Sequence, residues 1–103
     1  SWDNYMVSSF DHDQLAELKQ IEPRIRRAPL YGKDLPEDYI ATAHALGAWS
    51  LNLNASTVTA ELVDRCHREG FRVHVYTVNE PDEIARQRKL GGDGIIGDYP
   101  DKL

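Results

Sequence analysis

Hydrophobic residues recur along this chain with two different periods, one typical of strands and one typical of helices. The strand-like segments are short β-type runs that cover residues 5–10, 24–31, 48–54, 71–78 and 93–98, with clear alternation at 48–54 and 71–78. The longer segments between them have the apolar spacing of an amphipathic helix and cover residues 11–23, 35–47, 59–70 and 80–92. The pattern therefore predicts five strands separated by four helices.

This regular alternation of strand and helix predicts a parallel sheet of the α/β class. Successive strands recur about every 20–25 residues, which leaves room for a crossover helix between them. Antiparallel hairpins would require short turn dipeptides between the strands, and the sequence has none there. We expect an open doubly wound layer or part of a (β/α) barrel, built as a single domain over residues 1–103.

The predicted element ends carry residues that are common at such positions. Asp11 or Asp13 can cap the first helix, and Thr59 can cap the third. Pro36 is expected in the first turn of the second helix. Pro29 suits the end of the second strand, because proline cannot donate a hydrogen bond within a sheet.

The stretch "KLGGDGIIGDYP" at residues 89–100 raises the question of a phosphate-binding loop. Gly91 and Gly92 follow a predicted helix and precede a predicted strand. A phosphate-binding glycine loop has the opposite order, because it follows a strand and opens the helix whose N-terminus faces the anion. These glycines are therefore interpreted as helix-ending and turn residues.

Composition narrows the classes of partner. The chain has 12 basic and 17 acidic side chains, and no cluster of basic residues that would suit nucleic acid or an anionic membrane. Its single cysteine, Cys66, excludes an internal disulfide and a cysteine-rich zinc site. No apolar run approaches the ~18–20 residues of a membrane span, and the first residues do not resemble a signal peptide. A cytoplasmic location is the expectation.

Candidate binding residues are sought where strands end, since α/β proteins bind ligands beyond the carboxyl ends of their strands. In "RVHVYTV", the β-branched residues Val73, Val75 and Thr77 are expected to pack under helices. His74 and Tyr76 then point toward the middle of the sheet or barrel. His74 is either a hydrogen-bonded structural residue or part of a pocket.

Other polar residues near strand ends also have two interpretations each. His12 is either a base held by a neighbouring carboxylate or a first-turn residue in a solvated helix cap. Asp98 is either a binding residue or the N-cap of a terminal turn. Asp11 with Asp13 is interpreted as an acidic helix N-terminus rather than as a pair of metal ligands. No catalytic residue and no metal ligand is assigned.

The segment "GFRVHVYTVNEPDEIARQRKLGGDGIIGDYPDKL" resembles the end of the glycerophosphodiester phosphodiesterase family. Members typically have a strand ending in a Trp-Thr-Val-Asn-type motif and a helix opening with Asp/Glu-Pro-Asp/Glu. A Gly-x-Asp-Gly-Ile-Ile-x-Asp-x-Pro-Asp-x-Leu ending follows. All three are present, with Tyr76 where tryptophan is usual and Gly97 where threonine is common. "SSFDHDQLAELKQIEPRI" resembles the family's Ser-Phe-Asp strand end and the helix after it.

The resemblance implies a metal-dependent TIM barrel that hydrolyses glycerophosphodiesters to glycerol 3-phosphate and an alcohol, using a divalent cation such as Ca²⁺ or Mg²⁺. The chain lacks the family's His-Arg-Gly motif, and no Glu-x-Asp or Glu-x-Lys occurs in the family's strand context. The match begins at about the fourth barrel strand. The chain is therefore expected to be a relative or fragment that is inactive alone. The carried-over pocket residues are Phe10, Tyr76 and Asn79, with His74 beside them.

Five strands cannot close an eight-stranded barrel, so the outermost strands are expected to have unpaired edges. We expect a half-barrel that self-associates, most simply as a dimer, or that binds a complementary N-terminal half-barrel. One alternative is an enzyme whose site forms across an oligomer from His12, His74 and Asp98. The others are a non-enzymatic scaffold or interaction module, and a different phosphate-handling barrel with a similar terminal pattern.

Overall fold

The computed structural model describes residues 5–76, 81–91 and 94–96. Its strands are β1 (Met6–Ser9), β2 (Arg26–Tyr31), β3 (Ser50–Asn54), β4 (Arg72–Tyr76) and β5 (Gly94–Ile96). Its helices are α1 (His12–Ile21), α2 (Tyr39–Ala45), α3 (Ala60–Arg68) and α4 (Pro81–Lys89), with a short 3₁₀ helix, η2, at Ala55–Thr57. The predicted alternation of strands and helices is confirmed.

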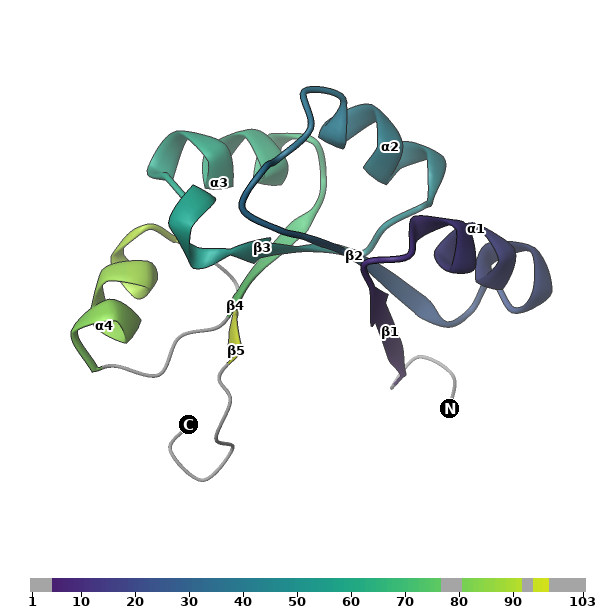
Figure 1. The fold of residues 1–103 in the computed structure, drawn as a ribbon, viewed down its shortest axis with the longest axis horizontal. Coiled ribbons are helices and arrows are strands. Elements are labelled where there is room, and N and C mark those ends of the chain that lie inside the picture. The colour runs from purple at the N-terminus through teal and green to yellow at the C-terminus, as the bar shows by residue number, and fades with distance from the viewer. Residues whose placement is uncertain (1–4, 77–80, 92–93, 97–103) are drawn as a thin grey trace.

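The strands form one parallel sheet in the order β1-β2-β3-β4-β5, so each strand lies beside its neighbour in sequence. Figure 1 shows the strands as a curved inner layer, with α1 to α4 on its outer, convex side. A doubly wound sheet carries helices on both faces, whereas a (β/α) barrel carries them only outside. The fold is therefore an arc of such a barrel, as predicted. The expected self-association of this half-barrel stays a prediction.

Two prolines differ from their expected positions. α2 begins at Tyr39 rather than at Pro36, because the Pro36 carbonyl accepts a hydrogen bond from the Tyr39 amide at 3.2 Å and closes a turn before the helix. Pro29 lies inside β2 and is buried. β2 pairs with β1 through residues 26–29 and with β3 through residues 30–31, so Pro29 lies where the strand changes partner. Its missing amide hydrogen is tolerated at that position.

Side-chain caps fix where two of the helices begin. The Asp11 carboxylate accepts hydrogen bonds from the amides of Asp13 and Gln14 at 3.1 and 3.2 Å. Thr59 caps α3 in the same way. Asp11, rather than Asp13, is therefore the cap of α1, and its carboxylate satisfies amides that have no partner within the helix.

Gly91 follows α4 with a φ angle of +87°, the left-handed conformation that glycine adopts at helix ends. This confirms the interpretation of Gly91 as a helix-ending residue. Gly92 lies outside the described residues.

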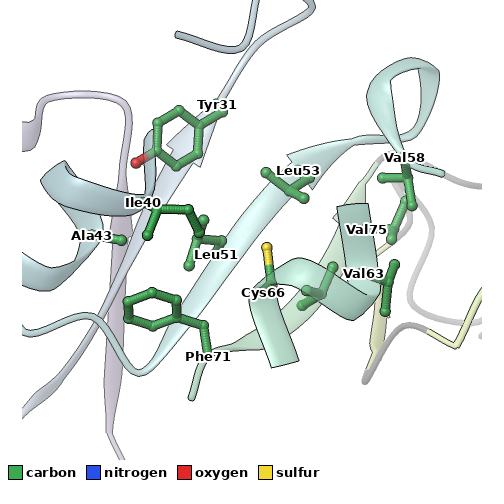
Figure 2. Packing of buried hydrophobic residues seen from close by; sticks show 11 residues of the cluster. Tyr31, Ile40, Ala43, Leu51, Leu53, Val58, Val63, Cys66, Phe71 and Val75 are labelled. Atoms are coloured by element: carbon green, nitrogen blue, oxygen red, sulfur yellow. The ribbon is translucent and has the colours of Figure 1, made fainter. Parts of the chain in front are cut away.

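The hydrophobic core lies between the convex face of the sheet and the helices (Figure 2). Four alternate residues of the two central strands are 0% exposed and belong to this core: Leu51, Leu53, Val73 and Val75. Helix residues such as Ile40 and Val63 pack against them. The predicted helix-facing role of Val73 and Val75 is confirmed, and Thr77 lies outside the described residues.

Cys66 also lies in this core and is fully buried. Burial raises the pKa of its thiol to about 11. A thiol that stays neutral and inaccessible is a poor nucleophile and a poor metal ligand. Cys66 is therefore a packing residue.

Candidate functional site

The concave face of the sheet is lined by the alternate residues that do not meet the helices. β3 contributes Ser50 and Asn52 to this face, and β4 contributes His74 and Tyr76. Ser50 is 0% exposed and Asn52 is 1% exposed. Because buried polar groups are costly unless they are hydrogen-bonded, the bonds made by these side chains decide what the face can do.

A chain of side-chain hydrogen bonds crosses the concave face from β1 to β3. The Asn52 amide donates to the Ser8 hydroxyl at 2.8 Å, and Ser8 donates to the Ala28 carbonyl at 2.8 Å. Ser8 and Asn52 lie on strands that are not neighbours. Ala28 is the β2 partner of Ser8, and its small side chain allows the amide to reach across.

The same chain of bonds continues from β3 to β4. The Ser50 hydroxyl lies 3.2 Å from the Asn52 side-chain oxygen and makes a short hydrogen bond with Nδ1 of His74. If Ser50 donates to Asn52, then Nδ1 of His74 carries the proton and donates to Ser50. His74 is thus hydrogen-bonded into the interior of the half-barrel, which agrees with the structural interpretation of this residue.

Two aromatic residues meet at the carboxyl-terminal end of the sheet. The rings of Phe10, just after β1, and Tyr76, at the end of β4, have centroids 6.1 Å apart at 81°, an edge-to-face contact. The Tyr76 hydroxyl donates a hydrogen bond to the Tyr31 carbonyl at the end of β2. Phe10 remains 62% exposed. The sheet curvature thus brings together two of the predicted pocket residues from strands that are not neighbours.

The other predicted site residues are not gathered at this point within the described chain. Nε2 of His12 donates to the Leu30 carbonyl at 3.0 Å, and its ring packs edge-on against Tyr31 at 5.0 Å. That bond requires the proton on Nε2, so this nitrogen is not available as a base. Asn79 and Asp98 lie outside the described residues. The assignment of Phe10, Tyr76, Asn79 and His74 to a substrate pocket stays a prediction.

The structure adds residues that the sequence analysis did not assign to a site. Ser8, Ser50 and Asn52 form the polar interior, and the alternation in "SLNLN" was the signal that could have identified the two residues of β3. The Trp49 ring contacts the guanidinium groups of Arg26 on β2 and Arg72 on β4 at the amino-terminal end of the sheet. No local sequence signal points to that contact.

The described residues do not fit a divalent cation. No group of three His, Cys, Asp or Glu side chains within residues 5–76, 81–91 and 94–96 is arranged to hold a metal ion. The polar groups of the concave face are hydroxyl, amide and imidazole groups that already bond to one another. Of the helices in the same ranges, none is long and apolar enough to cross a membrane.

The sequence profile of the glycerophosphoryl diester phosphodiesterase family matches residues 1–102. The chain belongs to this family. Among curated relatives, the glycerophosphodiester phosphodiesterase of Bacillus altitudinis is 34% identical over 97% of this chain and 41% of its own length. That of Caldanaerobacter subterraneus is 33% identical over 95% of this chain and 40% of its own length. The chain therefore spans about two fifths of the length of these relatives.

Solved structures of the family share the fold. An Oleispira antarctica phosphodiesterase, solved with the product sn-glycerol-3-phosphate, superposes with a TM-score of 0.86 at 24% identity. The match covers 94% of this chain and 39% of that protein. The half-barrel of this glycerophosphoryl diester phosphodiesterase family member thus corresponds to one part of a larger domain.

Proposed function

We propose that this chain forms one wall of the substrate pocket of a metal-dependent glycerophosphodiester phosphodiesterase and is inactive alone. The reaction is the hydrolysis of a glycerophosphodiester to glycerol 3-phosphate and an alcohol. The observation that carries the proposal is the contact between Phe10 and Tyr76, with ring centroids 6.1 Å apart. The two rings lie at the carboxyl ends of the strands, where (β/α) barrels bind their substrates.

The aromatic pair suits binding rather than acid–base chemistry. Tyr76 donates its hydroxyl hydrogen to the Tyr31 carbonyl, so its ring is held in place and its proton is already used. Phe10 is 62% exposed, so its ring surface is accessible to a ligand. Such surfaces pack against the carbon skeleton of a substrate, while a few polar groups fix its orientation. We also propose Asn79 as a polar residue at the rim of the pocket.

The proposed inactivity of the isolated chain follows from the chemistry of the concave face. The described residues offer no cluster of cation ligands, and His12 and His74 are engaged with Leu30 and Ser50. Hydrolysis at neutral pH needs a cation or an acid–base pair to activate water. We propose that a complementary half-barrel supplies the ligands for Ca²⁺ or Mg²⁺ and the acid–base residues.

A complementation assay tests this proposal. The chain is mixed with the part of the Bacillus altitudinis relative that precedes the matched region, and release of glycerol 3-phosphate from a glycerophosphodiester is followed. We expect no hydrolysis by either half alone. The mixture is expected to be active with Ca²⁺ or Mg²⁺, and chelation of the cation should abolish the activity.

Two variants make the assay specific for the pocket wall. Tyr76→Ala should lower the activity of the mixture about tenfold or more, because a displaced substrate reacts slowly. Ile21→Ala, at a side chain 78% exposed on α1, should leave it unchanged. Hydrolysis by the chain alone, or an associated but inactive mixture, would contradict the proposal.

A second candidate function, a self-associating scaffold, is favoured by the outer strand β1. Within the described residues β1 pairs with β2 alone, and Tyr5, Met6 and Val7 are 59%, 39% and 41% exposed. An exposed apolar edge strand tends to add a further strand. Light scattering on a size-exclusion column should then show a dimer or larger assembly at all concentrations, and a stable monomer would contradict the scaffold.

A further inference from the structure

Two arginines lie over one tryptophan ring at the amino-terminal ends of the central strands. The guanidinium carbon of Arg26, the first residue of β2, is 4.5 Å from the centroid of the Trp49 ring. That of Arg72, the first residue of β4, is 4.4 Å from the same centroid. We call these three residues the Arg–Trp–Arg cluster. It brings two positive charges to one end of the concave face.

The backbone holds the Arg–Trp–Arg cluster in place. The Trp49 amide donates to the Arg27 carbonyl at 2.8 Å, and the Arg72 amide donates to the Trp49 carbonyl at 3.2 Å. The His74 ring also stacks on the indole, with centroids 5.8 Å apart and planes 25° apart. The backbone of Trp49 is thus bonded on both sides and its ring rests on His74, so the indole offers both guanidinium groups a common surface.

The charges of the cluster are not neutralised within the described residues. Arg24, Arg65 and Arg68 each form an ion pair with a carboxylate. Neither Arg26 nor Arg72 has an ion pair or a side-chain hydrogen bond in that part of the chain. The chain as a whole carries a net charge of −5, so carboxylates are abundant, yet none reaches this cluster in the described residues.

We propose that the Arg–Trp–Arg cluster is a binding site for a phosphate-type dianion. A guanidinium group over an aromatic ring still has N–H groups that can donate to oxyanion oxygens. Both guanidinium carbons lie within 4.5 Å of one ring centroid, so a dianion at the edge of the indole attracts both charges, and a single carboxylate neutralises them only in part.

This site is separate from the proposed substrate pocket. Arg72 pairs with Ser50 at the start of β3, and Tyr76 pairs with Asn54 at its end. At about 3.3 Å per residue, the two positions lie about 13 Å apart along the sheet. The dianion site therefore belongs to the amino-terminal end of the half-barrel, and the proposal does not depend on the pocket or on catalysis.

The test uses the full chain with Trp2→Phe, which leaves Trp49 as its one indole. Inorganic phosphate is titrated against chloride at equal ionic strength, and the indole N–H resonance of Trp49 is followed by NMR. We expect a saturating shift of the resonance with phosphate and none with chloride. At saturation, we also expect phosphate to raise the melting temperature by about 4 °C over chloride.

Matched variants separate a site from a general salt effect. Arg72→Gln and Arg26→Gln should each weaken phosphate binding about tenfold or more. Arg68→Gln removes an arginine that pairs with Asp64 at 3.1 Å on α3, and should leave the titration unchanged. A shift that is linear in phosphate, is reproduced by chloride, or survives loss of either cluster arginine would overturn the proposal. Even if a variant fails to fold, the titration of the chain with both arginines intact still distinguishes saturable binding from a salt effect.

Discussion

Over residues 50–53 of β3 the two faces of the sheet are equally buried but are stabilised in different ways. On the convex face, Leu51 and Val73 are 0% exposed and pack against helices. On the concave face, Ser50 and Asn52 are 0% and 1% exposed, and they bond to one another, to His74 of β4 and to Ser8 of β1. The convex face gains free energy from area removed from water, whereas the concave face avoids a penalty by satisfying its polar groups.

This difference separates what maintains the fold from what prepares the site. An apolar face tolerates replacement by residues of similar volume. A series of linked side-chain hydrogen bonds does not tolerate such replacements, because removing one side chain leaves its partners unsatisfied. The concave face is therefore where the identity of each side chain matters most.

The largest effect is expected on the convex face. Leu51→Ala should lower the free energy of unfolding by about 3 kcal/mol, because it creates a cavity in a fully packed core. Urea denaturation followed by circular dichroism measures it, with Ile21→Ala, at a side chain 78% exposed, as the control that should change little. A loss below about 1 kcal/mol would mean that the core is not tightly packed.

The second largest effect on stability is expected for the side-chain hydrogen bonds that cross the concave face. Asn52→Ala should lower the free energy of unfolding by about 2 kcal/mol, because Ser8 and Ser50 lose a partner. In a double-mutant cycle with Ser8→Ala, the loss of stability in the double mutant should be smaller than the sum of the two single losses by roughly 1 kcal/mol. Additive losses would show that the two side chains are not coupled across Ala28.

A titratable group on the convex side gives a pH-dependent effect. The pKa of the Cys66 thiol rises from 9.0 to about 11 through burial. A raised pKa adds stability that is complete below the unfolded pKa and is lost as pH rises toward the folded value. Stability should therefore fall above pH 9, by about 1.4 kcal/mol at pH 10.

Cys66→Ala should remove that slope between pH 9 and 10. Above this range, part of the fall should remain, because burial also raises the pKa of Tyr31 to about 12. Chemical denaturation at a series of pH values makes the comparison. If stability falls as steeply between pH 9 and 10 in the variant, groups other than Cys66 cause the loss of stability at alkaline pH.

The smallest effect concerns the aromatic pair. Tyr76→Phe removes the hydrogen bond to the Tyr31 carbonyl and keeps the ring contact with Phe10, so the loss should be about 1 kcal/mol or less. Phe10→Ala, at a side chain 62% exposed, should cost still less stability. A large loss for Phe10→Ala would place this ring in the core of the fold rather than at a binding surface.

Local sequence patterns determined most of the fold. The alternation in "RVHVYTV" assigned Val73 and Val75 to the helices and His74 and Tyr76 to the interior, since strand side chains alternate between faces. Asp11 and Thr59 marked the helix starts because capping is a local interaction. The predicted start of α2 near Pro36 was wrong, since a proline suits both the first turn of a helix and the turn before it.

Only the tertiary structure decided which residues meet. Ser8 and Asn52 are 44 residues apart, and Tyr76 and the Tyr31 carbonyl are 45 apart, so no local pattern relates them. Curvature of the sheet brings strands that are not neighbours within reach across its concave face, as the pairing of Phe10 with Tyr76 shows. The same curvature gathers Arg26 and Arg72 over Trp49. The sequence by itself determined which face each side chain lies on, and the bending of the parallel sheet determined its partners.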